Sequence, residues 1–88
     1  MELLKATGFI KRGKNRKVVF MNLDKSLMPS ELVMKIYKSN SNTYFNLISR
    51  ALAELRDKKL VEVVNPEDRT GRIYRRTKEG EKVSKQIN

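Results

Sequence analysis

The sequence predicts an α+β fold in which helices come first and a β-hairpin follows them. Two observations lead to this prediction. Apolar residues recur at helical spacing between residues 14 and 58. The β-branched segment 60–64 and a second strand-like segment, residues 72–76, then flank a turn-forming stretch. No Gly/Ser linker, repeat or low-complexity tract interrupts the 88 residues. We therefore expect one domain, residues 1–88, with a single modest core.

Two helices are predicted in the first half of the chain, after an N-terminal stretch that we leave unassigned. The first spans residues 14–23, and its core face is formed by Val19, Phe20 and Leu23. The second spans residues 29–38, because Pro29 is tolerated at a first helical position, where its missing N–H is not needed. Its apolar stripe is formed by Leu32, Val33 and Ile36.

A third helix, residues 43–58, has the most regular periodicity, and the Ser/Asn run at residues 39–42 predicts the turn before it. Its core face is formed by Tyr44, Ile48, Ala51, Leu52 and Leu55. The other faces carry small or polar side chains, of which Arg50 is the only cation along the middle of the helix. This third helix and the second are therefore predicted to be joined by a short turn.

The C-terminal third predicts a two-stranded hairpin and a last helix. Residues 60–64 form the first strand, which Pro66 stops, and residues 72–76 form the second. Thr77 can then cap a final helix over residues 78–87, although Gly80 in its first turn is a poor helix former.

The composition excludes several kinds of chemistry. The chain has no His and no Cys, so structural zinc, a thiol nucleophile, a disulfide and a Ser-His-Asp triad are ruled out. No carboxylate pairing motif or Gly-rich phosphate loop is present, and we expect no enzyme activity, cofactor or metal. The apolar runs fall far short of the roughly 20 residues of a membrane span, and the N-terminus does not resemble a signal peptide. We expect a cytoplasmic protein that does not bind membranes.

The charge of the chain favours a polyanion as its partner. The sequence has 20 Lys and Arg against 10 Asp and Glu, a formal net charge of +10. Cations gather without any acid in two segments, residues 5–17 and 69–78. Because cations that neutralise phosphates release counterions, nucleic acid is the first candidate. A charge that serves only solubility is the alternative.

The order of helix, helix-turn-helix and hairpin with a basic tip is that of a winged helix. Residues 50–61 and 66–80 resemble the recognition helix and wing of MarR/ArsR-like winged-helix transcription regulators, especially small archaeal ones, and the resemblance extends less sharply back to Arg16. Two positions depart from the family pattern. Lys59 stands where Gly usually supplies a left-handed helix end, and Arg76 stands where an apolar residue usually precedes the Thr that starts the last helix.

The resemblance implies that the third helix enters the major groove of double-stranded DNA and that the hairpin contacts the minor groove or the backbone. Asn46 can pair with adenine and Arg50 with guanine, while Thr43 or Ser49 can bind a phosphate or a base edge. A merely solvated helix face is the alternative for these four residues. Phe45 is expected to pack on the second helix, with contact to a thymine methyl as the other reading.

The basic residues of the hairpin form the second part of the expected DNA site. Arg69 and Arg72 suit a narrow minor groove, and Asp68 can orient one of them through a bidentate pair. Glu67 and Asp68 repel phosphate, so a wing held away from DNA is the alternative. The remaining cations and turn residues are expected to contact the backbone: Arg75, Arg76, Lys78, Arg16, Ser41 and Asn42.

We therefore expect a nucleoid-associated transcription regulator that binds a two-fold operator as a homodimer. Residues 1–9 and the last helix, with Val83 and Ile87, carry the only apolar residues to spare for a dimer contact. The alternative function is a winged-helix module for RNA or protein assembly, associated with the ribosome or with a polymerase. The small, hydrogen-bonding face of the third helix favours groove entry over that alternative.

Overall fold

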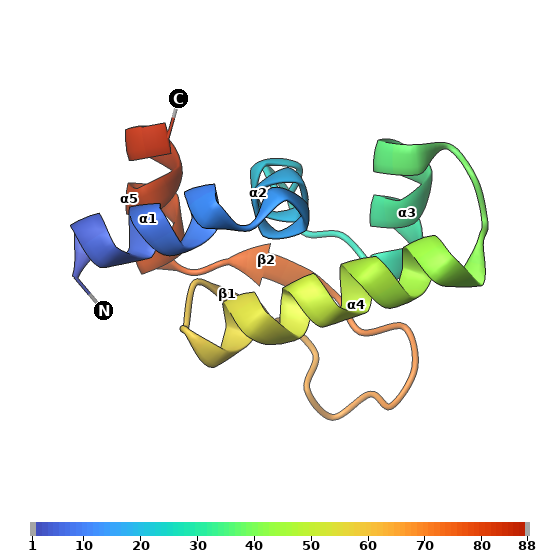
Figure 1. Cartoon of the computed structure of the whole chain (residues 1–88). Coiled ribbons are helices and arrows are strands. Elements are labelled where there is room, and N and C mark those ends of the chain that lie inside the picture. Colours follow the sequence, from blue (N-terminus) through green and yellow to red (C-terminus); the bar gives the residue numbers. More distant parts are fainter. Residues whose placement is uncertain (1, 88) are drawn as a thin grey trace.

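The computed structural model describes residues 2–87, which form an α+β fold of five helices and one two-stranded antiparallel sheet (Figure 1). The elements in chain order are α1 (Leu3–Arg12), α2 (Lys14–Met21), α3 (Pro29–Tyr37), α4 (Asn42–Asp57), β1 (Val61–Val63), β2 (Tyr74–Arg76) and α5 (Lys78–Ile87). In Figure 1 the other four helices lie above α4, and the loop between β1 and β2 extends below it. No helix within residues 2–87 has the length and apolar character needed to cross a membrane.

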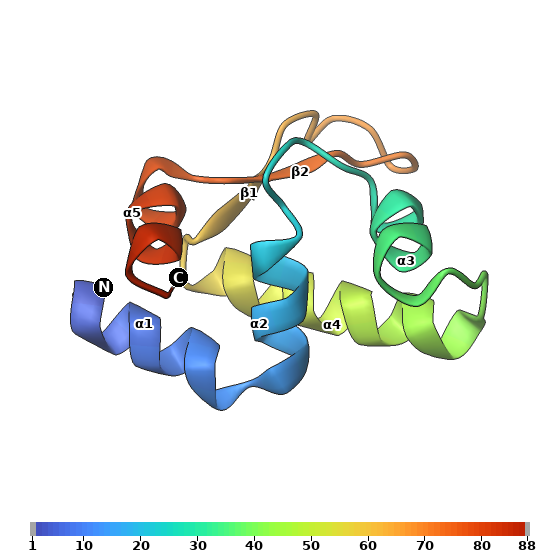
Figure 2. The same cartoon turned by 90° about the horizontal axis from the view of Figure 1, so that it is seen from above.

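The N-terminal stretch that the sequence left unassigned is a helix, α1. It packs against α2 and α5 (Figure 2), and its Ala6 and Ile10 are fully buried. Val83 of α5 is buried as well. The expectation that these two segments hold spare apolar residues is therefore wrong for most of them, because they complete the core of the same chain. Leu3 and Leu4 are the exceptions, at 41% and 86% exposure; Met1 lies outside the described residues.

The predicted core faces of α2, α3 and α4 are confirmed in most positions. Nine of the predicted core residues are 2% exposed or less: Val19, Phe20, Leu23, Leu32, Val33, Ile48, Ala51, Leu52 and Leu55. Ile36 and Tyr44 are only half-buried. Tyr44 stacks on Tyr37 of α3, with 4.2 Å between the ring centroids. This stack closes the outer edge of the contact between α3 and α4.

The ends of α3 and α4 are fixed by local hydrogen bonds. Met28 precedes α3 without a side-chain cap, and its main-chain N–H instead donates to the carboxylate of Glu31 at 2.8 Å. Lys38 ends α3 in a left-handed conformation, with φ of 57°. Ser41 caps α4, since its hydroxyl accepts from the Thr43 N–H at 3.2 Å. A turn of four residues thus joins the two helices.

The hairpin strands are shorter than predicted. Their register pairs Val61 with Arg76, Glu62 with Arg75 and Val63 with Tyr74. Leu27 forms an isolated antiparallel bridge with Tyr74 in addition to these three pairs. Strand pairing ends at Val63 and Tyr74. Residues 64–73 form a loop held by a main-chain bond from the Val64 N–H to the Ile73 carbonyl at 2.8 Å and by the side-chain bonds described below. The predicted cap of α5 is confirmed: the Thr77 hydroxyl accepts from the Gly80 N–H at 3.0 Å.

Candidate nucleic-acid interface

The face of α4 opposite the core is exposed along its whole length. Thr43, Asn46, Arg50 and Ala53 are exposed, and Ser49 is half-buried. At 3.6 residues per turn these positions lie opposite the stripe centred on Ile48. None of the ion pairs in the described part of the chain involves Arg50. Its guanidinium is therefore uncompensated by any carboxylate at ion-pair distance.

The N-terminal end of α4 presents two of the residues expected to contact the backbone. Ser41 is half-buried and its hydroxyl is used as the helix cap. Asn42, the first residue of the helix, is exposed. The positive end of the helix macrodipole lies at these residues, which favours an anion there.

The loop between the strands, residues 64–73, is shaped by Asn65. Its amide nitrogen donates to the Asp68 carboxylate at 2.7 Å and to the Gly71 carbonyl at 3.1 Å. Its amide oxygen accepts from the Ile73 N–H at 2.7 Å. Gly71 has φ of +66°, a conformation that suits glycine. Sequence reasoning assigned Asn65 no role, although Asn before Pro is a recognised turn signal.

The two arginines of this loop are placed differently. Arg69 is exposed, whereas Arg72 is half-buried and its Nε donates to the main-chain carbonyl of Asp68 at 3.0 Å. The expected bidentate pair between Asp68 and an arginine is not formed: within residues 2–87 the Asp68 carboxylate takes part in no ion pair and accepts a hydrogen bond from Asn65. The aspartate nevertheless orients Arg72, through its main chain.

A groove joins the loop to α4. It has a volume of about 360 Å³ and is lined by Met28, Pro29, Ser30, Phe45, Ser49, Arg69, Thr70, Gly71, Arg72 and Tyr74. Phe45 is 43% exposed and lines this groove together with the first residues of α3. The loop, the start of α3 and one edge of the exposed face of α4 therefore form a continuous surface.

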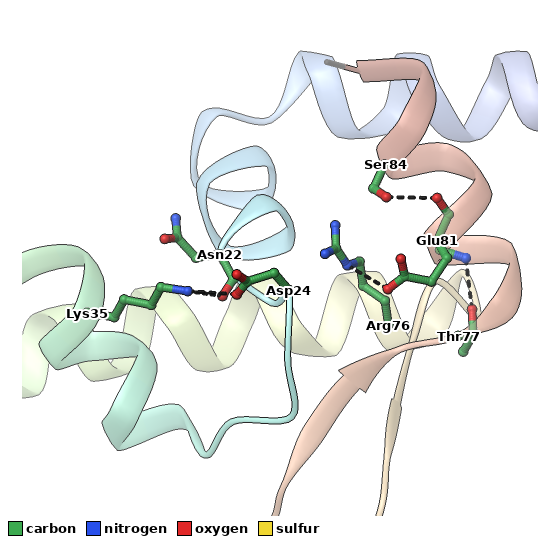
Figure 3. A network of polar contacts seen from close by, with 8 residues as sticks. Asn22, Asp24, Lys35, Arg76, Thr77, Glu81 and Ser84 are labelled. Atoms are coloured by element: carbon green, nitrogen blue, oxygen red, sulfur yellow. Dashed lines mark hydrogen bonds and ion pairs between the residues drawn. The ribbon is translucent and has the colours of Figure 1, made fainter.

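Arg76 does not belong to this surface, contrary to the sequence-based expectation. Its side chain is only 8% exposed. The guanidinium lies 5.4 Å from the centre of the Phe20 ring, and its Nε lies 3.1 Å from the Glu81 carboxylate without making a hydrogen bond (Figure 3). The side chain of Arg76 thus lies inside the fold. Arg75 on the other face of β2 is half exposed, and its Nε pairs with Glu62 at 2.7 Å.

Arg16 is also occupied within the fold. Its Nε and Nη2 donate to the Phe9 carbonyl at 3.2 and 2.8 Å, and the guanidinium lies 4.0 Å from the centre of the Phe9 ring. Nη1 lies 3.7 Å from the Glu54 carboxylate of α4. With 19% of its side chain exposed, Arg16 ties α1 to α2 and is poorly placed for a phosphate. Lys78, at the start of α5, is exposed.

One ion pair holds the segment between α2 and α3. Lys35 donates to the Asp24 carboxylate at 2.8 Å and to the Asn22 carbonyl at 2.9 Å (Figure 3). The hydrogen bond from Lys35, followed by its charge, lowers the pKa of Asp24 below its ordinary value. The pair fastens α3 to the end of α2.

The site therefore combines a small, polar helix face with an adjacent loop that carries an exposed arginine. Such a surface can enter a groove and form hydrogen bonds to base edges and phosphates. No protein-family model, curated protein or solved structure matches this chain.

Proposed function

We propose that the chain is a winged-helix protein that binds double-stranded DNA in a sequence-specific manner and regulates transcription. In this proposal α3 and α4 are the helix-turn-helix, and the β1–β2 hairpin is the wing. The observation that carries the proposal is the continuous surface formed by the exposed face of α4 and the hairpin loop. The resemblance of residues 50–61 and 66–80 to MarR/ArsR-like regulators, especially small archaeal ones, supports the same assignment.

The shape of α4 supports entry into a major groove. Its 16 residues span about 24 Å at 1.5 Å per residue. The major groove of DNA is about 12 Å wide and admits a helix whose leading side chains are not bulky. Asn46 and Ala53 meet that condition. Thr43, at the N-terminal end, is positioned for a phosphate at the groove edge.

Asn46 and Arg50 are the proposed readers of sequence. Both are exposed and lie one helical turn apart. An Asn side chain can bond both adenine edge atoms, and an Arg side chain both acceptors of guanine. Ser49 lines the protein groove between α4 and the wing, and its hydroxyl can bond a DNA phosphate or a base edge.

The wing supplies affinity in this proposal. Arg69 extends into an adjacent minor groove, where narrow geometry concentrates negative potential. The DNA backbone is contacted by Arg72, Arg75, Lys78 and Asn42. Arg76 and Arg16 are left out of the contact set, because their guanidinium groups are engaged inside the fold.

The proposed regulator binds a two-fold operator as a homodimer, as part of the nucleoid in the cytoplasm. Leu3 and Leu4 are exposed apolar residues at the start of α1. They are the proposed centre of the dimer contact, because the other apolar residues of α1 are used in the core. Closed two-fold symmetry is the commonest arrangement of homo-oligomers.

Selection of bound sites from random duplex DNA tests the proposal. The expected result is an enriched motif of two inverted half-sites about 10 base pairs apart at about 100 mM salt. An RNA hairpin of equal length serves as competitor. Absence of any enriched motif, or stronger competition by the RNA than by the selected duplex, would overturn the proposal in favour of an assembly module.

A further inference from the structure

A second basic surface lies on α1 and α2, separate from the proposed DNA face. The end of α1 and the outer side of α2 line a groove with a volume of about 550 Å³. Its lining residues are Lys11, Arg12, Lys14, Lys17, Val18, Met21 and Asn22. Four of the seven are cations and none is acidic.

The four cations are unpaired. Lys11, Arg12, Lys14 and Lys17 are all exposed, and none takes part in an ion pair within residues 2–87. Arg16 of the same helix differs, because it turns inward to Phe9 and Glu54. The mutual repulsion of charges within one Debye length, about 10 Å at 0.1 M salt, is relieved by an anionic ligand.

The groove also has an apolar component. Val18 and Met21 are half-buried in it, while the adjacent Val19 and Phe20 point into the core. The side-chain amide of Asn22 donates to the Val18 carbonyl at 2.7 Å, so the amide serves the helix end. An apolar side chain of a ligand can therefore be buried between Val18 and Met21, whose thioether adapts to different shapes.

The residues that line this groove are separate from those of the groove in the proposed DNA contact, which lie on α4, at the start of α3 and in the hairpin. Helices α1 and α2 lie above α4 in Figure 1, and the hairpin loop extends below it. The core face of α2 packs against α4 through Val19 and Phe20. A duplex seated on α4 and the loop leaves the outer side of α2 uncovered.

We infer that this groove binds an acidic segment of another protein, which places at least one apolar side chain on Val18 and Met21. Its carboxylates pair with Lys11, Arg12, Lys14 and Lys17. The phosphates of a DNA or RNA backbone can pair with the four cations, but the backbone has no aliphatic side chain to bury against Val18 and Met21. A membrane surface requires projecting apolar side chains, whereas Val18 and Met21 are half-buried. The inference goes beyond DNA binding and does not depend on it.

The test uses the full chain and a fluorescein-labelled synthetic peptide of about twelve residues, rich in Glu, with two Leu four positions apart. A second peptide has both Leu replaced by Gln and keeps the same charge. The variant is Lys14→Glu/Lys17→Glu, and the control is Lys82→Glu/Lys85→Glu on α5, which changes the net charge equally. Circular dichroism verifies that both variants fold, and fluorescence anisotropy at about 100 mM salt measures binding.

The Leu peptide is expected to bind, and the Lys14→Glu/Lys17→Glu variant to bind it at least about tenfold more weakly. The control variant is expected to stay within about threefold of the original protein. Amide signals of Val18 and Met21 should shift on titration with the Leu peptide only. Equal binding of the Gln peptide, equal weakening by the control variant, displacement by a duplex lacking the selected motif, or tighter binding to anionic phosphatidylserine vesicles would overturn the inference, as would failure of the Leu peptide to bind.

Discussion

The side-chain oxygen of Asn65 accepts a hydrogen bond from the main-chain N–H of Ile73 at 2.7 Å, and so joins the two ends of the hairpin loop. The nitrogen of the same amide holds Asp68 and Gly71. Together with main-chain bonds from the Val64 N–H to the Ile73 carbonyl at 2.8 Å and from the Asp68 N–H to the Asn65 carbonyl at 3.1 Å, this side chain sets the shape of the loop. The loop is pre-organised before it meets any ligand, which reduces the ordering cost of binding.

Asn65→Ala is expected to lower the free energy of unfolding by about 1 to 2 kcal/mol, because three partly exposed hydrogen bonds are lost. It should also speed exchange of the Ile73 amide hydrogen and weaken binding to the selected duplex. Urea unfolding, hydrogen exchange and gel shift measure the three effects. Asn15→Ala, at an exposed position of α2, is the matched control. Unchanged exchange at Ile73 would refute the role given to Asn65.

Apolar periodicity predicts the helices whose apolar residues all lie on one face. Ile48, Leu52 and Leu55 repeat at helical spacing, and the helix they form is the one predicted. Two strand-like segments predict the hairpin, but the shape of the loop between them depends in part on Asn65, whose partners are up to eight residues away. Periodicity carries no information about such side-chain bonds.

Charged residues show a second limit of sequence reasoning. Arg75 and Arg76 are adjacent and chemically identical, yet one is half exposed and the other is buried against Phe20. The alternation of a strand requires opposite faces for the pair, but which face is covered depends on α2 and α5. The use of α1 as core depends in the same way on contacts with α5, far along the chain.

Gly80→Ala is expected to destabilise the protein by about 1 to 3 kcal/mol, as overpacking does. A Cβ at this position would overlap the carbonyl oxygen of Leu60, which is held in place by the Thr77 N–H at 3.1 Å. Gly8→Ala is the control: a Cβ there meets only Arg12 Nη1 at 3.8 Å, and the gain in helix propensity should stabilise α1 by up to about 1 kcal/mol. The urea midpoint is expected to fall for Gly80→Ala and to rise for Gly8→Ala, relative to the original protein. Equal midpoints for the two variants would contradict the close approach at Gly80.

Lys59→Gly is expected to stabilise the protein by about 0.5 to 1 kcal/mol. Lys59 has φ of 61°, in the left-handed region that costs a residue with a Cβ about 1 kcal/mol or more; glycine avoids most of that cost. The predicted left-handed helix end is thus confirmed, with lysine in place of glycine. Lys58→Gly is the neighbouring control, since Lys58 has φ of −89° and should lose about 0.5 to 1 kcal/mol. Thermal or urea unfolding measures the stability of both variants. A less stable Lys59→Gly protein would contradict a backbone strain at Lys59.

Lys35→Gln is expected to raise the pKa of Asp24 toward its ordinary value of 3.8, because the hydrogen bond and the charge of Lys35 hold it lower. A carboxylate with a lowered pKa in the folded state stabilises the fold above its unfolded pKa, and this contribution is lost as pH falls through the folded pKa. The window therefore lies below 3.8. NMR titration of the Asp24 carboxyl carbon measures the change, with Lys25→Gln as the control. An identical Asp24 titration in Lys35→Gln would exclude the pair.

Arg50→Ala and Arg75→Ala separate sequence reading from backbone attraction. Arg50→Ala, like Asn46→Ala, should cost about 1 to 3 kcal/mol on the selected duplex and relax base preference at one position, because a bidentate contact to one base is lost. Arg75→Ala should weaken binding to all sequences alike and reduce the slope of log affinity against log salt by about one. That reduction requires Arg75 to leave Glu62 for a phosphate, so Glu62→Gln should tighten binding to every duplex. Gel shifts on selected and scrambled duplexes at several salt concentrations measure all four variants. If Arg50→Ala lost the same affinity for the selected and the scrambled duplex, Arg50 would not read the base sequence. The backbone contact of the wing would then be tested by Arg75→Ala alone.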